Sequence, residues 1–144
     1  FMRILITGAS GLLGRALCKA YKEAGHEVKG VANSRAKQDL VKIDLKSETE
    51  IRNLCLEFKP EVIVHAAAVR RPEAGQDADH VLKFNTESAG VLGSIARQTG
   101  AWVLLISCHS VFSGSTSSQP CPPDLPPCPA DALGRSKAAS ERAL

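Results

Sequence analysis

The fold of this chain is decided by the stretch Ile4-Leu-Ile-Thr-Gly-Ala-Ser-Gly-Leu-Leu-Gly14. An apolar, β-rich run at residues 3–7 is bounded by Gly8, and apolar residues then recur at helical spacing as far as Gly25, a C-terminal cap. In such a strand–turn–helix context, three glycines at intervals of three predict a dinucleotide site. The first allows a tight turn, the second lets the backbone approach a pyrophosphate, and the third lets the helix pack on the strand. The alternative is a glycine-rich turn that binds no ligand.

The rest of the chain alternates strand and helix patterns. We expect further strands at 27–32, 40–43, 61–65 and 101–107, and helices at 48–58, 78–99 and 131–144. The link 33–39 is too short for a full helix, the Ser-, Pro- and Gly-rich stretch 113–130 should be irregular, and the unbroken apolar run 101–107 is typical of a strand covered on both faces. This order predicts one α/β domain over residues 1–144, with a doubly wound, Rossmann-like parallel sheet of about five strands.

Composition excludes several classes of protein. A chain of 144 residues with 44% hydrophobic and 23% charged residues suits one globular domain, and a net charge of +3 without a basic stripe argues against nucleic acid. Its apolar runs are too short to cross a membrane, and its five cysteines lack the CxxC pairs of zinc sites, so we expect no metal. Cys18 and Cys55 occupy apolar helical positions, while Cys121 and Cys128 share a loop where they would pair only under oxidation. These features favour a reducing, cytoplasmic location.

The end of the second expected strand bears on the choice of cofactor. NAD enzymes usually carry an acidic residue there, which binds the ribose hydroxyls, whereas this chain reads Val31-Ala-Asn-Ser-Arg35. Arg35 would pair with a 2′-phosphate and Ser34 would donate a hydrogen bond to it, so we expect NADP rather than NAD. A solvent-facing Arg35 is the alternative.

Short motifs along the chain resemble those of the extended short-chain dehydrogenases/reductases related to dTDP-4-dehydrorhamnose reductase. They occur in family order at Ile4–Gly14, Val62–Ala68, Arg70–Pro72, Phe84–Asn85, Ile106–Ser107, Val111–Phe112 and Gly134–Lys137. The spacing Gly-x-x-Gly-x-x-Gly is itself of the short-chain type. Within that group, Arg70-Arg71-Pro72 resembles the regulatory β subunits of methionine adenosyltransferase.

The resemblance implies a set of cofactor-binding residues. They are Thr7, Gly8, Ser10, Gly11, Leu12, Leu13 and Gly14 in the glycine stretch, Ser34 and Arg35 at the 2′-phosphate, Asp44 and Leu45 at the adenine edge, Ala66, Ala67 and Ala68 beside a ribose, and Asn85, Ser107 and Lys137. We interpret His65, which precedes the alanines, as a hydrogen-bonded structural histidine.

The catalytic positions depart from the family. Catalysis there resembles a Ser/Thr–Tyr–Lys relay, but the tyrosine position, four residues before Lys137, is Leu133, and the hydroxyl position is Cys108. Without the tyrosine, a general-acid contribution of roughly 10²–10⁴ in rate is missing. A Cys108–His109 nucleophilic pair is poorly supported because neighbours on a strand point to opposite faces. His109 as a proton donor and Lys137 as an ordinary surface lysine remain alternatives.

Extended reductases continue past the lysine helix into a substrate-binding lobe, whereas this chain ends at Leu144. We therefore expect the C-terminal substrate lobe to be lacking, and the edge of the fifth strand to be open or covered by a partner. The leading hypothesis is an NADP-binding pseudoenzyme that serves S-adenosylmethionine biosynthesis by binding the catalytic subunit of methionine adenosyltransferase. The alternatives are an active NADPH-dependent dTDP-4-keto-sugar reductase and a structural subunit with a vestigial nucleotide site.

Overall fold

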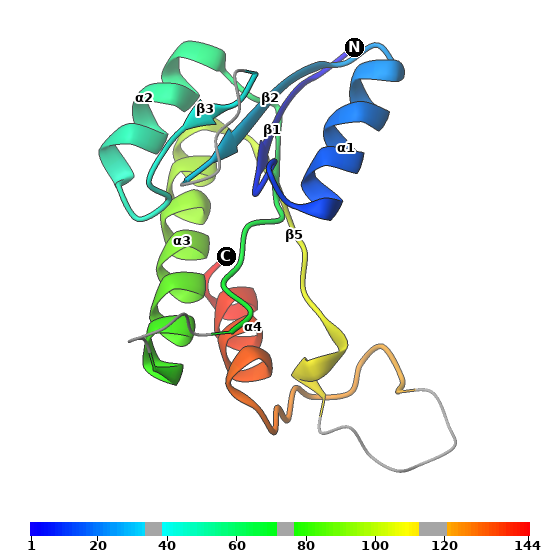
Figure 1. The fold of residues 1–144 in the computed structure, drawn as a ribbon, viewed down its shortest axis with the longest axis vertical. Coiled ribbons are helices and arrows are strands. Elements are labelled where there is room, and N and C mark those ends of the chain that lie inside the picture. Colours follow the sequence, from blue (N-terminus) through cyan, green and yellow to red (C-terminus); the bar gives the residue numbers. More distant parts are fainter. Residues whose placement is uncertain (34–38, 72–76, 113–120) are drawn as a thin grey trace.

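Figure 1 shows the computed structural model of the chain, which describes residues 1–33, 39–71, 77–112 and 121–144. Within these residues, five parallel strands form one sheet in the order β3-β2-β1-β4-β5. The strands are β1 (Arg3–Thr7), β2 (Glu27–Ala32), β3 (Val41–Lys42), β4 (Val62–His65) and β5 (Trp102–Leu105). The helices are α1 (Leu12–Glu23), α2 (Glu48–Phe58), α3 (Ala78–Thr99) and α4 (Ala132–Ala143), with a 3-10 turn at His109–Val111. The predicted Rossmann-like fold is confirmed.

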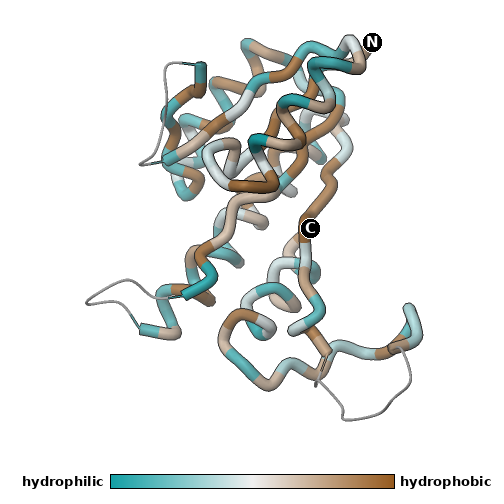
Figure 2. The backbone as a smooth tube through the Cα atoms, turned by 45° about the vertical axis from the view of Figure 1, so that its right-hand side comes forward, coloured by the Kyte–Doolittle hydropathy of each residue, from teal (hydrophilic) through white to brown (hydrophobic). Residues whose placement is uncertain are grey.

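Helices cover the sheet on both sides, with α1 on one face and α2 and α3 on the other (Figure 1). Alternate residues of the central strand β1 therefore enter two separate cores. Ile4 and Ile6 pack on the α1 side, whereas Leu5 packs with Ile51 of α2 and Leu92 of α3. In Figure 2 the hydrophobic segments accordingly run through the strands.

The helices begin and end where side chains or special backbone conformations satisfy their terminal groups. Ser47 accepts a hydrogen bond from the third residue of α2, and Asp77 and Asp131 do the same for α3 and α4. Left-handed residues end two helices, Lys59 with φ +52° after α2 and Gly100 with φ +74° after α3. Because these signals are local, the predicted bounds of α2 and α3 agree with the structure, and those of α4 differ by one residue at each end.

The predictions of strand length were less accurate. β3 has two residues instead of four, and β5 ends at Leu105 instead of Ser107, because only these residues pair with a neighbouring strand. Leu82 of α3, which the helical spacing of apolar residues predicts to be in the core, is 38% exposed. The expected link between β2 and β3 falls on residues 34–38, outside the described residues.

The prediction that both faces of β5 are covered was wrong. Val103 packs against the core beside α3, but Trp102 and Leu104 on the other face are 80% and 50% exposed. The reason is the position of β5 at the sheet edge, where no helix of the described part of the chain lies over this face. No strand in the described ranges pairs with the outer edge of β5. Long apolar side chains at such an edge are exposed although the sequence reads as buried strand.

The last helix packs on α3 rather than on the sheet, beside the part of α3 that extends beyond the strands (Figure 1). Small residues permit a close approach: a methyl group at Gly93 would lie 3.0 Å from the Leu144 side chain. The Ser140 hydroxyl donates a hydrogen bond of 3.0 Å to the Asn85 carbonyl across this contact. The position of α4 thus depends on close packing and buried polar contacts with α3.

The structure shows all five cysteines as free thiols. Cys55 is buried and Cys18 half-buried, and burial raises the pKa of both thiols, although Lys22 acts in the opposite sense on Cys18. Cys121 and Cys128 are exposed. Among the described residues, no helix is long and apolar enough to span a bilayer.

Two helical glycines offer a matched test of this packing. A methyl group at Gly134 would overlap the Ser110 carbonyl oxygen, whereas at Gly90 it would meet nothing within 4 Å. We expect Gly134→Ala to lower the free energy of unfolding by about 1–3 kcal/mol through overpacking. Gly90→Ala should raise it by about 0.5–1 kcal/mol through helix propensity. Urea denaturation measures both, and equal effects would contradict the described contact between α4 and the 3-10 turn.

Candidate nucleotide site

The glycine turn between β1 and α1 requires glycine at two of its three positions. Gly8 has φ +68°, and a Cβ there would lie 2.7 Å from the Ala67 nitrogen, so the turn lies directly against the segment that follows β4. A Cβ at Gly14 would overlap the Gly8 carbonyl oxygen, so α1 begins in direct contact with the turn. Both positions bring two backbone segments closer than any side chain permits.

The start of α1 presents an open backbone surface. Gly11 is exposed and precedes the helix in an extended conformation, with no side-chain cap, and a Cβ there would approach only the Gly8 carbonyl oxygen, at 3.2 Å. Leu12 is 83% exposed, Leu13 is 45% exposed and Ser10 is half-buried. N–H groups at a helix start that lack a side-chain acceptor, next to the exposed Gly11 with no Cβ of its own, fit the pyrophosphate of a dinucleotide.

The other predicted cofactor residues lie at the ends of the neighbouring strands. Ala66, Ala67 and Ala68 are half-buried after β4. After β3, the Asp44 carboxylate accepts a hydrogen bond of 3.0 Å from the Lys46 nitrogen, and Leu45 is buried in the core. Ser34 and Arg35 lie outside the described residues, as does Pro72 of the Arg-Arg-Pro motif, whereas Arg70 and Arg71 are exposed.

The side-chain polar groups of Asn85 and His65 form hydrogen bonds with other groups of the protein. The Asn85 amide donates 2.9 and 2.8 Å hydrogen bonds to the Val69 carbonyl and the Ser136 hydroxyl, and its oxygen accepts one of 2.8 Å from the Val69 nitrogen. Asn85 therefore ties the segment after β4 to both α3 and α4. His65 is 1% exposed and contacts Thr7 through Nδ1 and Ser88 through Nε2. The expectation of a hydrogen-bonded histidine is confirmed.

Lys137 is buried, not an ordinary surface lysine. It is 6% exposed, and its Nζ donates a hydrogen bond of 2.6 Å to the Ile106 carbonyl just beyond β5. Burial lowers the pKa of Lys137, while the neighbouring Cys108 and Glu141 act in the opposite sense. The geometry thus holds an ammonium group beside the end of β5.

The positions expected to carry catalysis gather around this lysine. Leu133 lies one turn before Lys137 on α4 and is half-buried. The Ser107 hydroxyl donates a hydrogen bond to the Glu141 carboxylate. Cys108, in an extended conformation, and His109, the first residue of the 3-10 turn, both lie beyond the end of β5. The rule that neighbouring residues on a strand point to opposite faces therefore does not apply to this pair. An open hollow next to them is bounded by Ser107, Cys108, His109, Val111, Phe112, Pro123–Pro127 and Glu141.

Sequence reasoning missed three polar residues of this region. Glu141 contacts Ser107, Ser88 contacts His65, and Ser136 contacts Asn85. A helical spacing of four from Lys137 could have indicated Glu141. No local pattern indicates Ser88 or Ser136, because their partners come from other elements. Among the described residues, no group of three or more His, Cys, Asp or Glu is placed to hold a metal ion.

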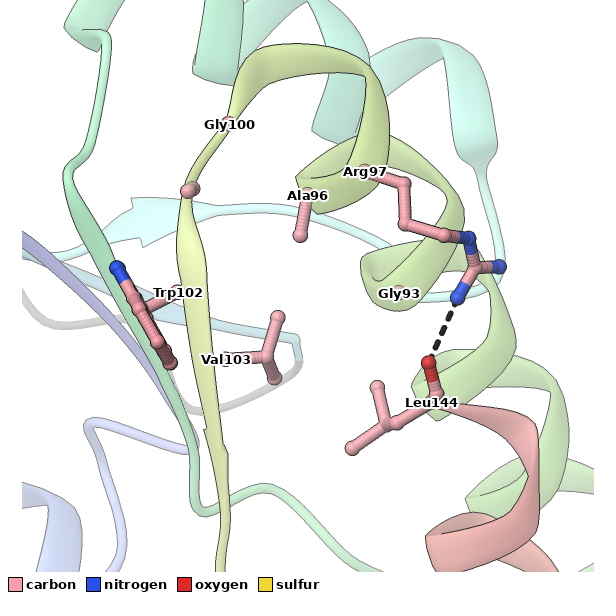
Figure 3. Close-up of a pocket in the computed structure, with 8 residues that line it drawn as sticks. Gly93, Ala96, Arg97, Gly100, Trp102, Val103 and Leu144 are labelled. Carbon is pink, nitrogen blue, oxygen red and sulfur yellow. Dashed lines mark hydrogen bonds between the residues drawn. The ribbon is translucent and has the colours of Figure 1, made fainter.

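A second hollow lies away from the glycine turn, between the C-terminal part of α3 and β5 (Figure 3). Arg97 donates a hydrogen bond of 2.7 Å to the Leu144 carbonyl at its border, and the Val103 side chain points into it. None of the predicted site residues lines this hollow.

The family model described as the RmlD substrate binding domain matches residues 2–144. This chain belongs to that family. It is 37% identical over 143 residues to methionine adenosyltransferase 2 subunit β of Xenopus laevis, covering 99% of this chain and 42% of that protein. It is 32% identical over 144 residues to a dTDP-4-dehydrorhamnose reductase of Burkholderia thailandensis, covering 99% of this chain and 45% of that protein.

The fold is shared with a hypothetical dTDP-4-dehydrorhamnose reductase from Sulfolobus tokodaii. The TM-score is 0.86 at 30% identity, over 99% of this chain and 51% of that one. Other solved structures with this fold, at 25% and 24% identity, are complexes with NAD and with NADP. The chain spans less than half the length of the curated relatives named above.

The pH dependence of stability tests the burial of His65. Burial, with a smaller contribution from Lys137, lowers the pKa of His65 from 6.5 to about 4. As pH falls, the unfolded chain therefore takes up this proton before the folded chain does, and stability present above pH 6.5 is lost progressively down to pH 4. We expect this loss to be about 3 kcal/mol.

Denaturation of the wild type and of His65→Gln at several pH values measures this contribution. The carboxylates titrate in both proteins, so their effect cancels in the difference between the two free energies of unfolding. The stability advantage of the wild type should shrink from pH 7 to pH 4.5. An advantage that stays constant over this range would show that His65 is not buried as described.

Proposed function

We propose that this chain is an NADP-binding, reductase-like domain that has lost its catalytic relay and acts as a regulatory or structural subunit. The contrast between two parts of one site carries the proposal. The glycine turn has the backbone geometry of a pyrophosphate cradle, with Gly8 at φ +68° and Gly11 exposed at the helix start, whereas Leu133 stands at the position of the family's proton donor. A leucine has no proton to give to a carbonyl oxygen.

In this proposal the residues divide the work of holding the cofactor. The N–H groups after Gly11 bind the pyrophosphate, and Ala66–Ala68 line the ribose with small side chains. Lys137 directs its buried ammonium group toward the ribose hydroxyls, and Ser34 and Arg35 bind the 2′-phosphate. A nicotinamide cofactor supplies a hydride when bound. Leu133 and Cys108 provide neither the acid nor the hydroxyl that a reduction would use with it.

The relatives support a protein partner. The matched β subunits are named as parts of methionine adenosyltransferase 2, so we propose the catalytic subunit of such an enzyme as the partner. We propose the cytoplasm as the place where the two proteins meet. A second candidate, an active NADPH-dependent dTDP-4-keto-sugar reductase, is favoured by the 32% identity to a dTDP-4-dehydrorhamnose reductase and by the buried Lys137. A vestigial nucleotide site in a structural subunit is the third.

Calorimetric titration with NADPH and NADH tests cofactor binding. We expect NADPH to bind about tenfold more tightly, because one charge-assisted contact of Arg35 with the 2′-phosphate is worth roughly 1.5–3 kcal/mol. Arg35→Ala should remove this preference and leave NADH binding unchanged. If neither nucleotide binds, the site is vestigial and the third candidate stands.

Gly11→Asp and Gly11→Asn are a matched control for the location of binding. Either side chain can cap α1, so both variants should remain folded. Aspartate adds a negative charge where the pyrophosphate would lie, and we expect it to abolish binding. A smaller loss with asparagine would separate the effect of charge from that of size.

Reductase assays with NADPH and a dTDP-4-keto-sugar test the loss of catalysis. We expect negligible turnover by the wild type, and a gain below tenfold for Leu133→Tyr, because Cys108 also departs from the relay. A gain of about 10²-fold or more would show that the acid alone was missing. Wild-type turnover that Lys137→Ala abolishes would establish the reductase instead.

A further inference from the structure

The hydroxyl of Thr7 joins the two chain segments to which we assign the nucleotide, the glycine turn and the segment after β4. Thr7 is the last residue of β1 and is fully buried, and its Oγ1 lies 2.7 Å from Nδ1 of His65, the last residue of β4. The same oxygen accepts a hydrogen bond of 3.2 Å from the Ala67 nitrogen. Gly8 follows directly, in backbone contact with Ala67. The glycine turn and the segment after β4 therefore meet at one hydroxyl.

The hydrogen bonds around His65 determine which ring nitrogen carries the proton. The buried Thr7 hydroxyl already accepts the Ala67 N–H, so its own proton goes to Nδ1 at 2.7 Å. The Ser88 oxygen, 3.3 Å from Nε2, can accept there while its proton goes to the Asn85 carbonyl at 3.2 Å. His65 is neutral at pH 7, because burial lowers its pKa to about 4. Nε2 therefore carries the proton, and Nδ1 accepts the proton of Thr7.

We propose that His65 is a positioning residue for the dinucleotide: through Thr7 it holds the glycine turn against Ala66–Ala68 and so sets the spacing between these two segments. This inference rests on the proposed nucleotide binding. His65 itself touches no ligand, since its ring is 1% exposed and both its nitrogens contact side chains of the protein.

An apolar side chain of the same volume would not replace the histidine in this role. The Thr7 hydroxyl is completely buried, and without an acceptor its proton would cost about 1–3 kcal/mol. The turn would move to find another acceptor, and Gly8 would move with it. The contact between His65 and Ser88, in contrast, joins β4 to α3 and does not involve the glycine turn.

Two pairs of substitutions separate positioning from packing. In His65→Asn the amide oxygen takes the place of Nδ1, so the Thr7 contact is kept and the Ser88 contact is lost. In His65→Gln the amide reaches the place of Nε2, so the Ser88 contact is kept and the Thr7 contact is lost. Thr7→Ser keeps the hydroxyl, and Thr7→Val replaces it with a methyl group of the same size.

Calorimetric titration with NADP⁺ at pH 7 gives the first readout. We expect His65→Gln and Thr7→Val to weaken binding about five- to tenfold, as the loss of one buried hydrogen bond predicts. His65→Asn and Thr7→Ser should stay within about twofold of the wild type. The double variant His65→Gln/Thr7→Val should bind no more weakly than Thr7→Val alone, because both changes remove the same contact.

Amide hydrogen exchange gives a second readout that needs no ligand. The Ala67 N–H donates to Thr7, and the Gly11 N–H donates a 2.9 Å bond to the Gly8 carbonyl within the turn. We expect both amides to exchange about tenfold faster in His65→Gln and Thr7→Val, and near the wild-type rate in His65→Asn and Thr7→Ser.

Equal losses of affinity in both His65 variants, in proportion to their losses of thermal stability, would show a packing role and overturn the proposal. Wild-type affinity and exchange in His65→Gln would also overturn it. If the wild type binds no dinucleotide, the proposed function fails, and the exchange comparison still decides whether His65 positions the turn.

Discussion

The backbone of the glycine turn lies against the backbone that follows the neighbouring strand β4, and the architecture depends on this contact. β1 and β4 are parallel and end side by side, with Thr7 opposite His65. From this point β1 leads into α1 on one face of the sheet, while β4 leads toward α3 on the other. In parallel α/β sheets ligands bind where connections diverge in this way. A Cβ at Gly8 would push the two segments apart.

The polar interior connects this point to the last helix. Asn85 holds the segment after β4 through both polar groups of Val69 and also contacts Ser136 of α4. Lys137, one residue further along α4, reaches the Ile106 carbonyl beyond β5. These groups are buried and hydrogen-bonded, so they specify one arrangement of α4 where an apolar contact would allow several. The lysine is therefore held in place by hydrogen bonds that use neither the Leu133 side chain nor the Cys108 thiol.

Belonging to the family does not by itself assign an activity, because its relatives include β subunits of methionine adenosyltransferase 2 and a dTDP-4-dehydrorhamnose reductase. The distinction lies in single side chains. A glycine turn requires only small residues and backbone groups, and this chain has Gly8 at φ +68° and an exposed Gly11 there. A reduction requires a proton donor and a hydroxyl at defined positions, and this chain has Leu133 and Cys108 there. The two requirements are independent, so a chain can retain one and lose the other.

The sequence by itself determined those features that depend on short stretches of chain. Glycine spacing indicated the turn, and apolar residues at helical spacing indicated the bounds of α2 and α3, because both patterns depend on near neighbours in the chain. Only the tertiary structure decided that Trp102 is exposed, since the apolar pattern of a strand does not tell whether a helix covers it. It also decided which polar groups meet. His65 contacts Thr7 58 residues away, and no local pattern encodes a hydrogen bond between the ends of two strands that become neighbours only when the sheet forms.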